Sequence, residues 1–161
     1  MDELVIMAAE LGRQLKRKGE VLALAESCTG GMVACAITHT AGSSAWFDRG
    51  FVTYSNLSKV EMLGVSLETL DTLGAVSEQT AQEMALGALQ FSQATIAGSI
   101  TGIAGPSGGS RQKPVGTICF AWAHKDGRIK RSTQLFRGDR AQIRRQAAEH
   151  ALLGFMTMLN Q

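Results

Sequence analysis

The stretch that decides the fold is VLALAESCTGG, residues 21–31. Residues 21–25 form a short, continuous apolar run, which is typical of a buried strand. Residues 26–31 form a tight polar turn with two glycines, and residues 32–38 are predicted to be helical. A strand, a tight turn and a helix in this order are typical of a ligand site in an α/β protein.

Helices and strands alternate on both sides of this stretch. Upstream, apolar residues at helical spacing predict a first helix that stops at Gly19, namely Leu4, Ala8, Leu11 and Leu15. Downstream, residues 47–55 are rich in aromatic and β-branched side chains and predict a strand, followed by a short helix over residues 59–63. Ser77 is a suitable N-cap for a helix that runs to residue 90.

The second half of the chain contains three more strands and a last helix. Residues 94–101 predict a buried strand, and a long loop follows over residues 102–114. Two further strands, residues 115–123 and 129–136, flank an Asp-Gly hairpin turn signal. Asp139, with Gln142 three residues on, predicts the start of the last helix. We therefore expect a single domain over residues 1–161: an α/β fold, built as a three-layer α/β/α sandwich on a mixed, mostly parallel sheet.

Composition excludes several classes of protein. The chain has 161 residues, 45% apolar and 19% charged, which predicts a globular protein that is not disordered. Its net charge of +2 comes from scattered basic residues, so we expect no nucleic-acid partner. We also expect neither metal nor cofactor, because no metal-ligand spacing links the cysteines and histidines, which are Cys28, Cys35, Cys119, His39, His124 and His150.

The same residues predict where the protein works. The first residues lack the basic and apolar regions of a signal peptide, and no apolar run approaches the ~18 residues of a membrane span. We therefore expect a cytoplasmic protein with reduced cysteines and no membrane partner.

The turn at residues 26–31 is the first candidate for chemistry. Ser27 and Cys28 are predicted to lie where a strand ends and a helix begins, and free N–H groups there favour an anion or a developing oxyanion. Gly30 and Gly31 allow a ligand to approach the backbone closely. The same pattern also fits a plain turn capped by Ser or Thr, and these residues alone do not decide between the two.

Tyr54 and Lys59 form the second candidate. Tyr54 is the only tyrosine in the chain, and Lys59 is predicted to lie in the first turn of a short helix. The positive end of the helix dipole disfavours a cation there, so the pKa of Lys59 should fall towards that of a general base. The alternative is an ordinary solvated lysine on a helix face.

Two further segments suit a phosphate group. The glycines of residues 102–114 predict a backbone cradle for phosphate or ribose, although the loop matches neither the P-loop nor the dinucleotide-binding pattern. Arg140 lies at a strand-to-helix junction, with Arg144 and Arg145 in the next turn, and a guanidinium there is a good phosphate partner. The alternative is that these arginines form structural ion pairs, for instance with Asp139 or Glu149.

Taken together in their order, the motifs of this chain resemble those of the CinA C-terminal domain family. The matching segments cover almost the whole chain: ESCTGG (26–31), AGSS (41–44), RGFVTYSN (49–56), GAVS (74–77), GIAGP (102–106), KPVGT (113–117) and GDR (138–140). The resemblance implies a three-layer CinA-like fold, a homodimer or higher homo-oligomer, and hydrolysis of nicotinamide mononucleotide (NMN) to nicotinate mononucleotide and ammonia in NAD recycling.

The mechanism that we expect is acyl transfer by an activated serine. Ser27 is the preferred nucleophile, with Lys59 taking its proton directly or through Tyr54. Ser44 is the reserve nucleophile, and Cys28 is a rival because a thiolate at a helix N-terminus would be activated. The residues expected to bind the nucleotide are Thr29, Gly30, Gly31, Ser44, Gly102, Ala104, Gly105 and Arg140. The alternative from another class is a nucleotide-binding or regulatory domain without catalysis.

Overall fold

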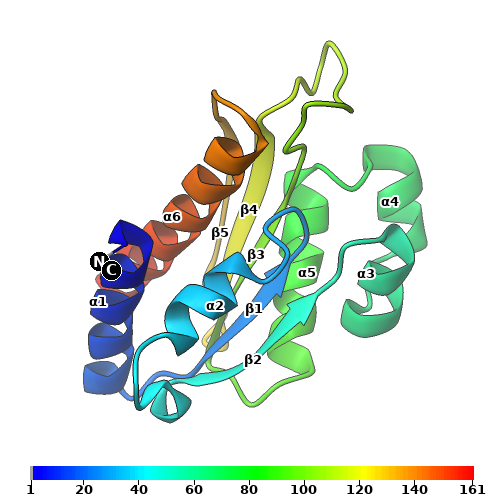
Figure 1. Cartoon of the computed structure of the whole chain (residues 1–161). Coiled ribbons are helices and arrows are strands. Elements are labelled where there is room, and N and C mark those ends of the chain that lie inside the picture. Colours follow the sequence, from blue (N-terminus) through cyan, green and yellow to red (C-terminus); the bar gives the residue numbers. More distant parts are fainter. Residues whose placement is uncertain (1) are drawn as a thin grey trace.

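Residues 2–161, which the computed structural model describes, build one five-stranded sheet with helices on both faces (Figure 1). Met1 of the predicted domain lies outside the described residues. In chain order, the elements are α1 (Glu3–Lys18), β1 (Leu22–Glu26), α2 (Met32–Thr38), the 3-10 turn η1 (Ser43–Ala45), β2 (Phe47–Val52), α3 (Asn56–Leu63), α4 (Leu67–Leu73), α5 (Glu78–Gln90), β3 (Ile96–Gly102), β4 (Thr117–His124), β5 (Ile129–Leu135) and α6 (Arg140–Leu159).

The strand order is β2-β1-β3-β4-β5. β1 pairs in parallel with β2 and with β3, whereas β4 is antiparallel to both of its neighbours, β3 and β5. Four strands therefore run in one direction and only β4 runs against them. The predicted mixed, mostly parallel sheet is confirmed.

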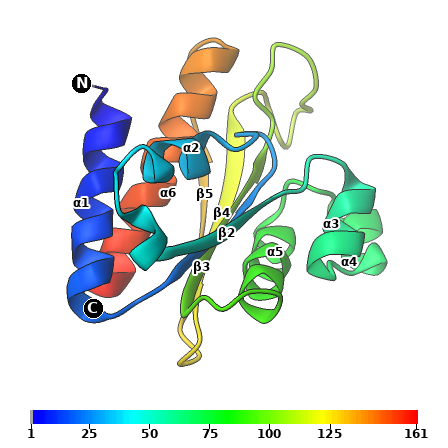
Figure 2. The same ribbon diagram turned by 60° about the horizontal axis from the view of Figure 1, so that its bottom comes forward.

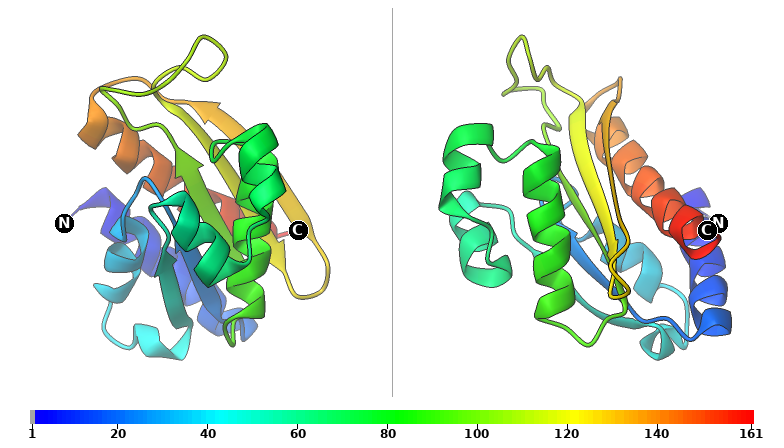
Figure 3. Two further views of the ribbon diagram at one scale, coloured as in Figure 1. Left: turned by 90° about the vertical axis from the view of Figure 1, so that its right-hand side faces the viewer. Right: turned by 180° about the vertical axis from the view of Figure 1, so that it is seen from behind.

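Two helical layers cover the sheet. Figures 2 and 3 show α1, α2 and α6 on one face and α3, α4 and α5 on the other. This arrangement confirms the three-layer α/β/α sandwich. Among the described residues, no helix combines the length and the apolarity that a membrane span requires.

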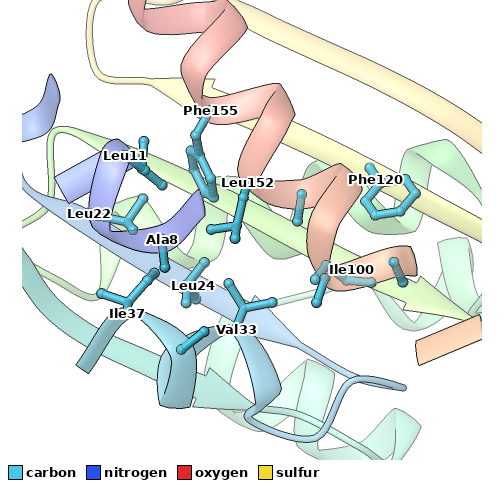
Figure 4. Packing of buried hydrophobic residues seen from close by; sticks show 14 of the residues in the cluster. Ala8, Leu11, Leu22, Leu24, Val33, Ile37, Ile100, Phe120, Leu152 and Phe155 are labelled. Carbon is cyan, nitrogen blue, oxygen red and sulfur yellow. The ribbon is translucent and has the colours of Figure 1, made fainter. Parts of the chain in front are cut away.

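The alternation of large and small side chains along the strands directs these two layers. In β1, Leu22 and Leu24 pack with α1, α2 and α6 (Figure 4). Ala23 and Ala25 belong to the core on the other face, under α5. Successive residues of a strand point to opposite faces, so this five-residue strand contributes to both cores. β4 follows the same rule, with Phe120 and Trp122 on the α6 face and smaller residues on the α5 face.

Capping residues set the helix boundaries. The Asp139 side chain accepts from the Gln142 N–H and the Gln142 side chain accepts from the Asp139 N–H, which confirms the predicted capping box of α6. The predicted N-cap of α5, Ser77, accepts from the Thr80 N–H. Helix α4, which has seven residues and is capped by Ser66, was not predicted from the sequence.

One boundary error matters for the site. Residues 53–55 were predicted to continue a strand, but β2 ends at Val52 and Ser55 is already the N-cap of α3. Lys59 is therefore the fourth residue of α3, and its N–H donates to the Ser55 carbonyl to close the first helical turn. The chain bends at Thr53 and Tyr54, which places α3 beside the carboxyl ends of β1 and β2.

Candidate active site

A pocket of about 320 Å³ lies at the carboxyl edge of the parallel strands. This edge is the usual position of ligand sites in open α/β sheets. The turn after β1, the start of α3, the loop after β3 and the start of α6 all contribute to its wall. Its lining residues are Ser27, Cys28, Tyr54, Asn56, Lys59, Ala75, Val76, Thr101, Gly102, Ile103, Ala104, Gly105, Ser107 and Arg140.

Ser27 and Lys59 meet at the floor of this pocket. Lys59 Nζ lies 3.1 Å from Ser27 Oγ, although the two residues are 32 positions apart in the chain. Both side chains are buried, Ser27 with 7% and Lys59 with 1% of its surface exposed. The Ser27 N–H donates to the Ile100 carbonyl of β3, which anchors the serine to the sheet.

Three oxygen atoms surround the Lys59 amine at hydrogen-bond distance. Besides Ser27 Oγ, its Nζ lies 3.0 Å from the Thr53 carbonyl oxygen and 3.2 Å from that of Tyr54. A neutral amine has two hydrogens and one lone pair. In the structure Lys59 Nζ donates to Ser27 Oγ as well as to the two carbonyls. Once the amine has lost a proton, the two carbonyls can accept its two remaining hydrogens, and its lone pair can accept the Ser27 hydroxyl proton. This is the arrangement of a nucleophile and its general base.

The electrostatic surroundings favour the neutral form of Lys59. Burial lowers its pKa below the usual range of lysine. In the described part of the chain no carboxylate forms an ion pair with it. The predicted direction of the pKa shift is therefore confirmed, but its main cause is burial and not the helix dipole.

The Cys28 thiol is not activated. Burial raises its pKa to about 11, so it stays protonated at neutral pH. Although Cys28 lines the pocket, the first residue of α2 is Met32, four positions further on. The raised pKa and the distance from the start of α2 both argue against Cys28 as a thiolate nucleophile, and Ser27 stays the preferred candidate.

Glu26 stabilises the turn and does not contact Lys59. Its buried carboxylate accepts from the Thr29 hydroxyl and from the N–H groups of Val33 and Ala34 in the first turn of α2. A carboxylate at this position satisfies free N–H groups and favours the helix dipole. The partners of the Glu26 carboxylate therefore lie in the turn and in α2, and not at Lys59.

Tyr54 and Arg140 form the outer wall of the pocket. Arg140 Nη2 lies 3.2 Å from the Tyr54 hydroxyl oxygen, and its Nη1 donates to the Gly105 carbonyl at 2.7 Å. Arg140 has no carboxylate partner within residues 2–161. Its charge is thus held at the pocket mouth and left free for an anion. Lys59 contacts the Tyr54 carbonyl and not its hydroxyl, and this contact favours the direct route from Ser27 to Lys59 over a route through Tyr54.

Comparison with known proteins identifies the family. The family model for the CinA C-terminal domain matches residues 5–159. The chain belongs to the CinA C-terminal domain family. It is similar to the nicotinamide-nucleotide amidohydrolase PncC of Enterobacter agglomerans, with 58% identity over 91% of this chain and 89% of that protein. The protein of the same name from Escherichia coli K12 is 54% identical, over 93% of this chain and 91% of that protein.

A solved structure supports the same assignment. The crystal structure of competence/damage inducible protein CihA from Agrobacterium tumefaciens is 44% identical in sequence and superimposes with a TM-score of 0.94. The superposition covers 100% of this chain and 98% of the CihA chain. Both the family and the CinA-like fold expected from the motifs are therefore confirmed.

Several residues expected to bind the nucleotide do not reach the pocket of this CinA-family chain. The Thr29 hydroxyl is bound to Glu26, and the Gly30 N–H donates to the Ser27 carbonyl, so neither group is free for a ligand. Gly31 is absent from the pocket wall. Ser44 lies in η1, which precedes β2, and therefore at the opposite, amino edge of the sheet. The remaining predicted residues line the pocket: Gly102, Ala104, Gly105 and Arg140.

Six residues of the pocket wall had no role predicted from the sequence. Ala75 and Val76 belong to the GAVS motif, which had been noted without a role, and Asn56 closes the RGFVTYSN motif. Thr101 lies near the end of β3, and its hydroxyl donates to the Ala75 carbonyl. Thr101 could have been found from the sequence, because it is a polar residue at the end of a buried strand. Ile103 and Ser107 are the remaining lining residues without an individual role predicted from the sequence.

Two further observations delimit the site. A hollow of about 490 Å³ between α1 and the end of α2 is larger than the pocket, but its ionisable lining residues, Arg13 and His39, are both exposed. It therefore lacks the buried polar groups of a reactive site. In residues 2–161, no cluster of three or more His, Cys, Asp or Glu side chains is placed to hold a metal ion.

Proposed function

We propose that this chain is an amidohydrolase that converts NMN and water into nicotinate mononucleotide and ammonia. The observation that carries the proposal is the buried Lys59 amine, which lies 3.1 Å from the Ser27 hydroxyl without a compensating carboxylate. The names of the relatives from Enterobacter agglomerans and Escherichia coli support the substrate.

The reaction begins when Ser27 attacks the carboxamide carbon. Neutral Lys59 takes the hydroxyl proton as the Oγ–C bond forms, and the carbonyl oxygen becomes an oxyanion. The Cys28 N–H is a suitable oxyanion donor, because Cys28 lines the pocket directly after Ser27 and its N–H makes no backbone–backbone hydrogen bond among residues 2–161.

The intermediate then collapses to an acyl-enzyme. Protonated Lys59 returns its proton to the amide nitrogen, the C–N bond breaks, and ammonia leaves. Water attacks the Ser27 ester with Lys59 again acting as base, which releases the carboxylate product and restores the serine. Each proton that Lys59 accepts is thus returned within the cycle.

Arg140 and Tyr54 hold the rest of the nucleotide. Arg140 carries the free charge at the pocket mouth and would bind the phosphate. Tyr54, with 62% of its surface exposed beside the pocket, offers an aromatic face to the pyridine ring. In this assignment Tyr54 assists catalysis by positioning the substrate and Arg140, and not by relaying a proton.

The alternative is a nucleotide-binding domain without catalysis. It would need the anion site at Arg140, but it would gain nothing from a buried lysine beside a serine, which costs desolvation energy. Ammonia release by the purified protein with NMN distinguishes the two. Binding of NMN without any turnover would support the alternative.

The nucleophile is tested by three matched alanine variants. We expect Ser27→Ala to abolish ammonia release, while Cys28→Ala and Ser44→Ala keep most of it. Mass spectrometry should detect an acyl adduct on Ser27 after rapid quenching. Near-full activity in Ser27→Ala would refute the serine mechanism.

We also propose that the enzyme works in the cytoplasm as a homo-oligomer and binds neither nucleic acid nor membranes. Free cysteines support a reducing compartment, since Cys28, Cys35 and Cys119 form no disulfide. The homo-oligomer is what the resemblance to the CinA C-terminal domain family implies. Light scattering on the purified protein measures the oligomer directly, and a monomer at all concentrations would refute this part.

A further inference from the structure

The side chain of Arg144 reaches from α6 to the turn that carries Ser27. Its Nε donates to the Cys28 carbonyl at 3.0 Å and its Nη2 donates to the Thr29 carbonyl at 3.1 Å. In the sequence Arg144 lies 116 and 115 residues from these two positions. One guanidinium thus joins two successive peptide groups immediately after the proposed nucleophile.

Arg144 contributes to a set of hydrogen bonds that holds the backbone carbonyls of residues 27–29. The Gly30 N–H donates to the Ser27 carbonyl, and Arg144 donates to the Cys28 carbonyl. The Thr29 carbonyl accepts from both Arg144 and the Met32 N–H. In a planar trans peptide the N–H points away from the C=O, so a held carbonyl also fixes the direction of its N–H. Cys28 lies between two held peptide groups, and the direction of its own N–H is therefore set.

Gly30 leaves the room that this contact requires. Its φ of +56° lies in the left-handed region, and a Cβ on it would lie 3.4 Å from Arg144 Nη2. A side chain at residue 30 would therefore be strained and would press on the guanidinium. The glycine and the arginine form one local arrangement.

The neighbouring Arg145 shows what a purely structural arginine does on the same helix. Its guanidinium pairs with the carboxylates of Asp2 and Glu149 near the surface. Arg144 forms no ion pair within residues 2–161, and its donors are directed at backbone carbonyls. Only a guanidinium offers several donors in a rigid fork, so lysine is a poor replacement.

We propose that Arg144 is a positioning residue for amide hydrolysis, which sets the 27–29 turn so that the Cys28 N–H is directed at the developing oxyanion. The inference rests on the proposed function, because it needs Ser27 as the nucleophile. Arg144 itself does not line the pocket and acts through the backbone of the turn.

The test compares Arg144→Gln with Arg145→Gln as a matched control. For Arg144→Gln we expect kcat for NMN to fall by about 10- to 100-fold, because a misdirected oxyanion donor costs transition-state stabilisation. KM should change by less than about threefold, because the substrate-binding residues are intact. Arg145→Gln should keep kcat, and Arg144→Lys should recover only a small part of the loss.

A binding measurement separates positioning from a damaged fold. Calorimetry with nicotinate mononucleotide gives the number of competent sites, and kcat is then normalised to that number. A merely structural brace would lower the site number and the melting temperature but would leave the normalised kcat unchanged, which would overturn the proposal. So would an equal loss of kcat in Arg145→Gln.

Hydrogen exchange tests the turn without relying on turnover. Amides of residues 27–31 should exchange faster in Arg144→Gln than in wild type or Arg145→Gln. Unchanged exchange would overturn the positioning role. The proposed function fails separately, if wild type releases no ammonia or if Ser27→Ala stays active.

Discussion

The two edges of the sheet each bury an ionisable side chain, but they treat its charge in opposite ways. At the carboxyl edge, Lys59 is buried with a serine and two carbonyls and without a carboxylate. At the amino edge, His124 has 9% of its side chain exposed, and its Nε2 lies 2.9 Å from Glu20 Oε2. Thr95 donates a hydrogen bond to the same carboxylate, and Asp126 lies on the other side of the imidazole.

The difference in partners gives the two edges different chemistry. Burial raises the pKa of Glu20, but hydrogen bonds from Thr95 and His124 outweigh it, so the pKa lies below its usual range. Glu20 therefore remains charged and ties β1, β3 and β4 together. Lys59 has no such compensation, and burial makes its neutral, basic form accessible. A buried cation without a counter-charge is therefore the better indicator of a reactive site.

The largest effect is expected when the Lys59 amine, which has no counter-charge among the described residues, is removed. Lys59→Met should lower kcat by about 10⁴-fold or more, because the nucleophile loses its base. Lys130→Met, on the exposed face of β5, is the matched control and should keep full activity. Ammonia release measures both, and circular dichroism confirms that the variants are folded. Substantial turnover in Lys59→Met would assign the base to another group.

The protonation of Lys59 should also appear in the pH dependence of kcat/KM and of stability. Because burial lowers the pKa of Lys59, kcat/KM should rise with pH as the amine loses its proton, with a midpoint below the usual range of lysine. Lys59→Arg stays charged and should lose this rise. Between the folded and unfolded pKa values the unfolded chain binds more protons, so the stability contributed by Lys59 rises with pH there. Equal pH profiles of unfolding for wild type and Lys59→Met would contradict this.

Arg140 tests the anion site at the carboxyl edge. Arg140→Gln should raise KM for NMN by about 10- to 100-fold, since hydrogen bonds to charged groups contribute about 1.5–3 kcal/mol. KM for nicotinamide riboside, which lacks the phosphate, should stay the same in the variant. Steady-state kinetics with both substrates check this. An equal increase for both would move the phosphate away from Arg140.

The amino edge should respond in stability and not in catalysis. Glu20→Gln should lower the free energy of unfolding by about 1–3 kcal/mol at pH 7 and leave kcat unchanged. Since the pKa of Glu20 is lowered, its stabilisation is present above the unfolded pKa and is lost as pH falls through the folded pKa. Urea titrations from pH 7 down to pH 3 should show the two proteins converging. A loss of kcat would show that the two edges are coupled.

The smallest effect is expected at Thr53, beside the lysine. Its hydroxyl is the buried side-chain polar atom in residues 2–161 that has no hydrogen-bond partner, while its carbonyl accepts from Lys59. Thr53→Val keeps the carbonyl and removes the hydroxyl, so kcat should be unchanged and stability should rise by about 1 kcal/mol. Thermal unfolding and ammonia release measure the two. A large loss of activity would give the hydroxyl a role in the reaction.

Local patterns predicted most of the architecture. Gly19, Ser77 and Asp139 marked helix ends, because capping depends on residues that lie within one turn of each other. The bend at residues 53–55 was missed, because its β-rich composition competes with the capping preference of Ser55. The short helix α4 was missed for a related reason, since a seven-residue segment carries little periodic signal.

The site was only partly predictable from the same residues. Ser27, Tyr54, Lys59 and Arg140 were selected by residue type and by their place at element ends, and the pocket includes all four. Ser27 was preferred over Ser44 and Cys28 as the nucleophile, but the sequence offered little to separate them, because their burial and the edge of the sheet that each occupies depend on the fold. The role of Arg144 was equally hidden, since its partners are backbone carbonyls more than 100 residues away.

Periodicity and capping along the chain were enough to predict every strand and all α-helices except α4, because these signals act over a few neighbouring residues. Only the tertiary structure decided that Lys59 meets Ser27 without a carboxylate and that the Cys28 thiol stays protonated. The physical reason is that a pKa depends on desolvation and on charges brought close by folding. Neither quantity is encoded in the neighbours of a residue along the chain.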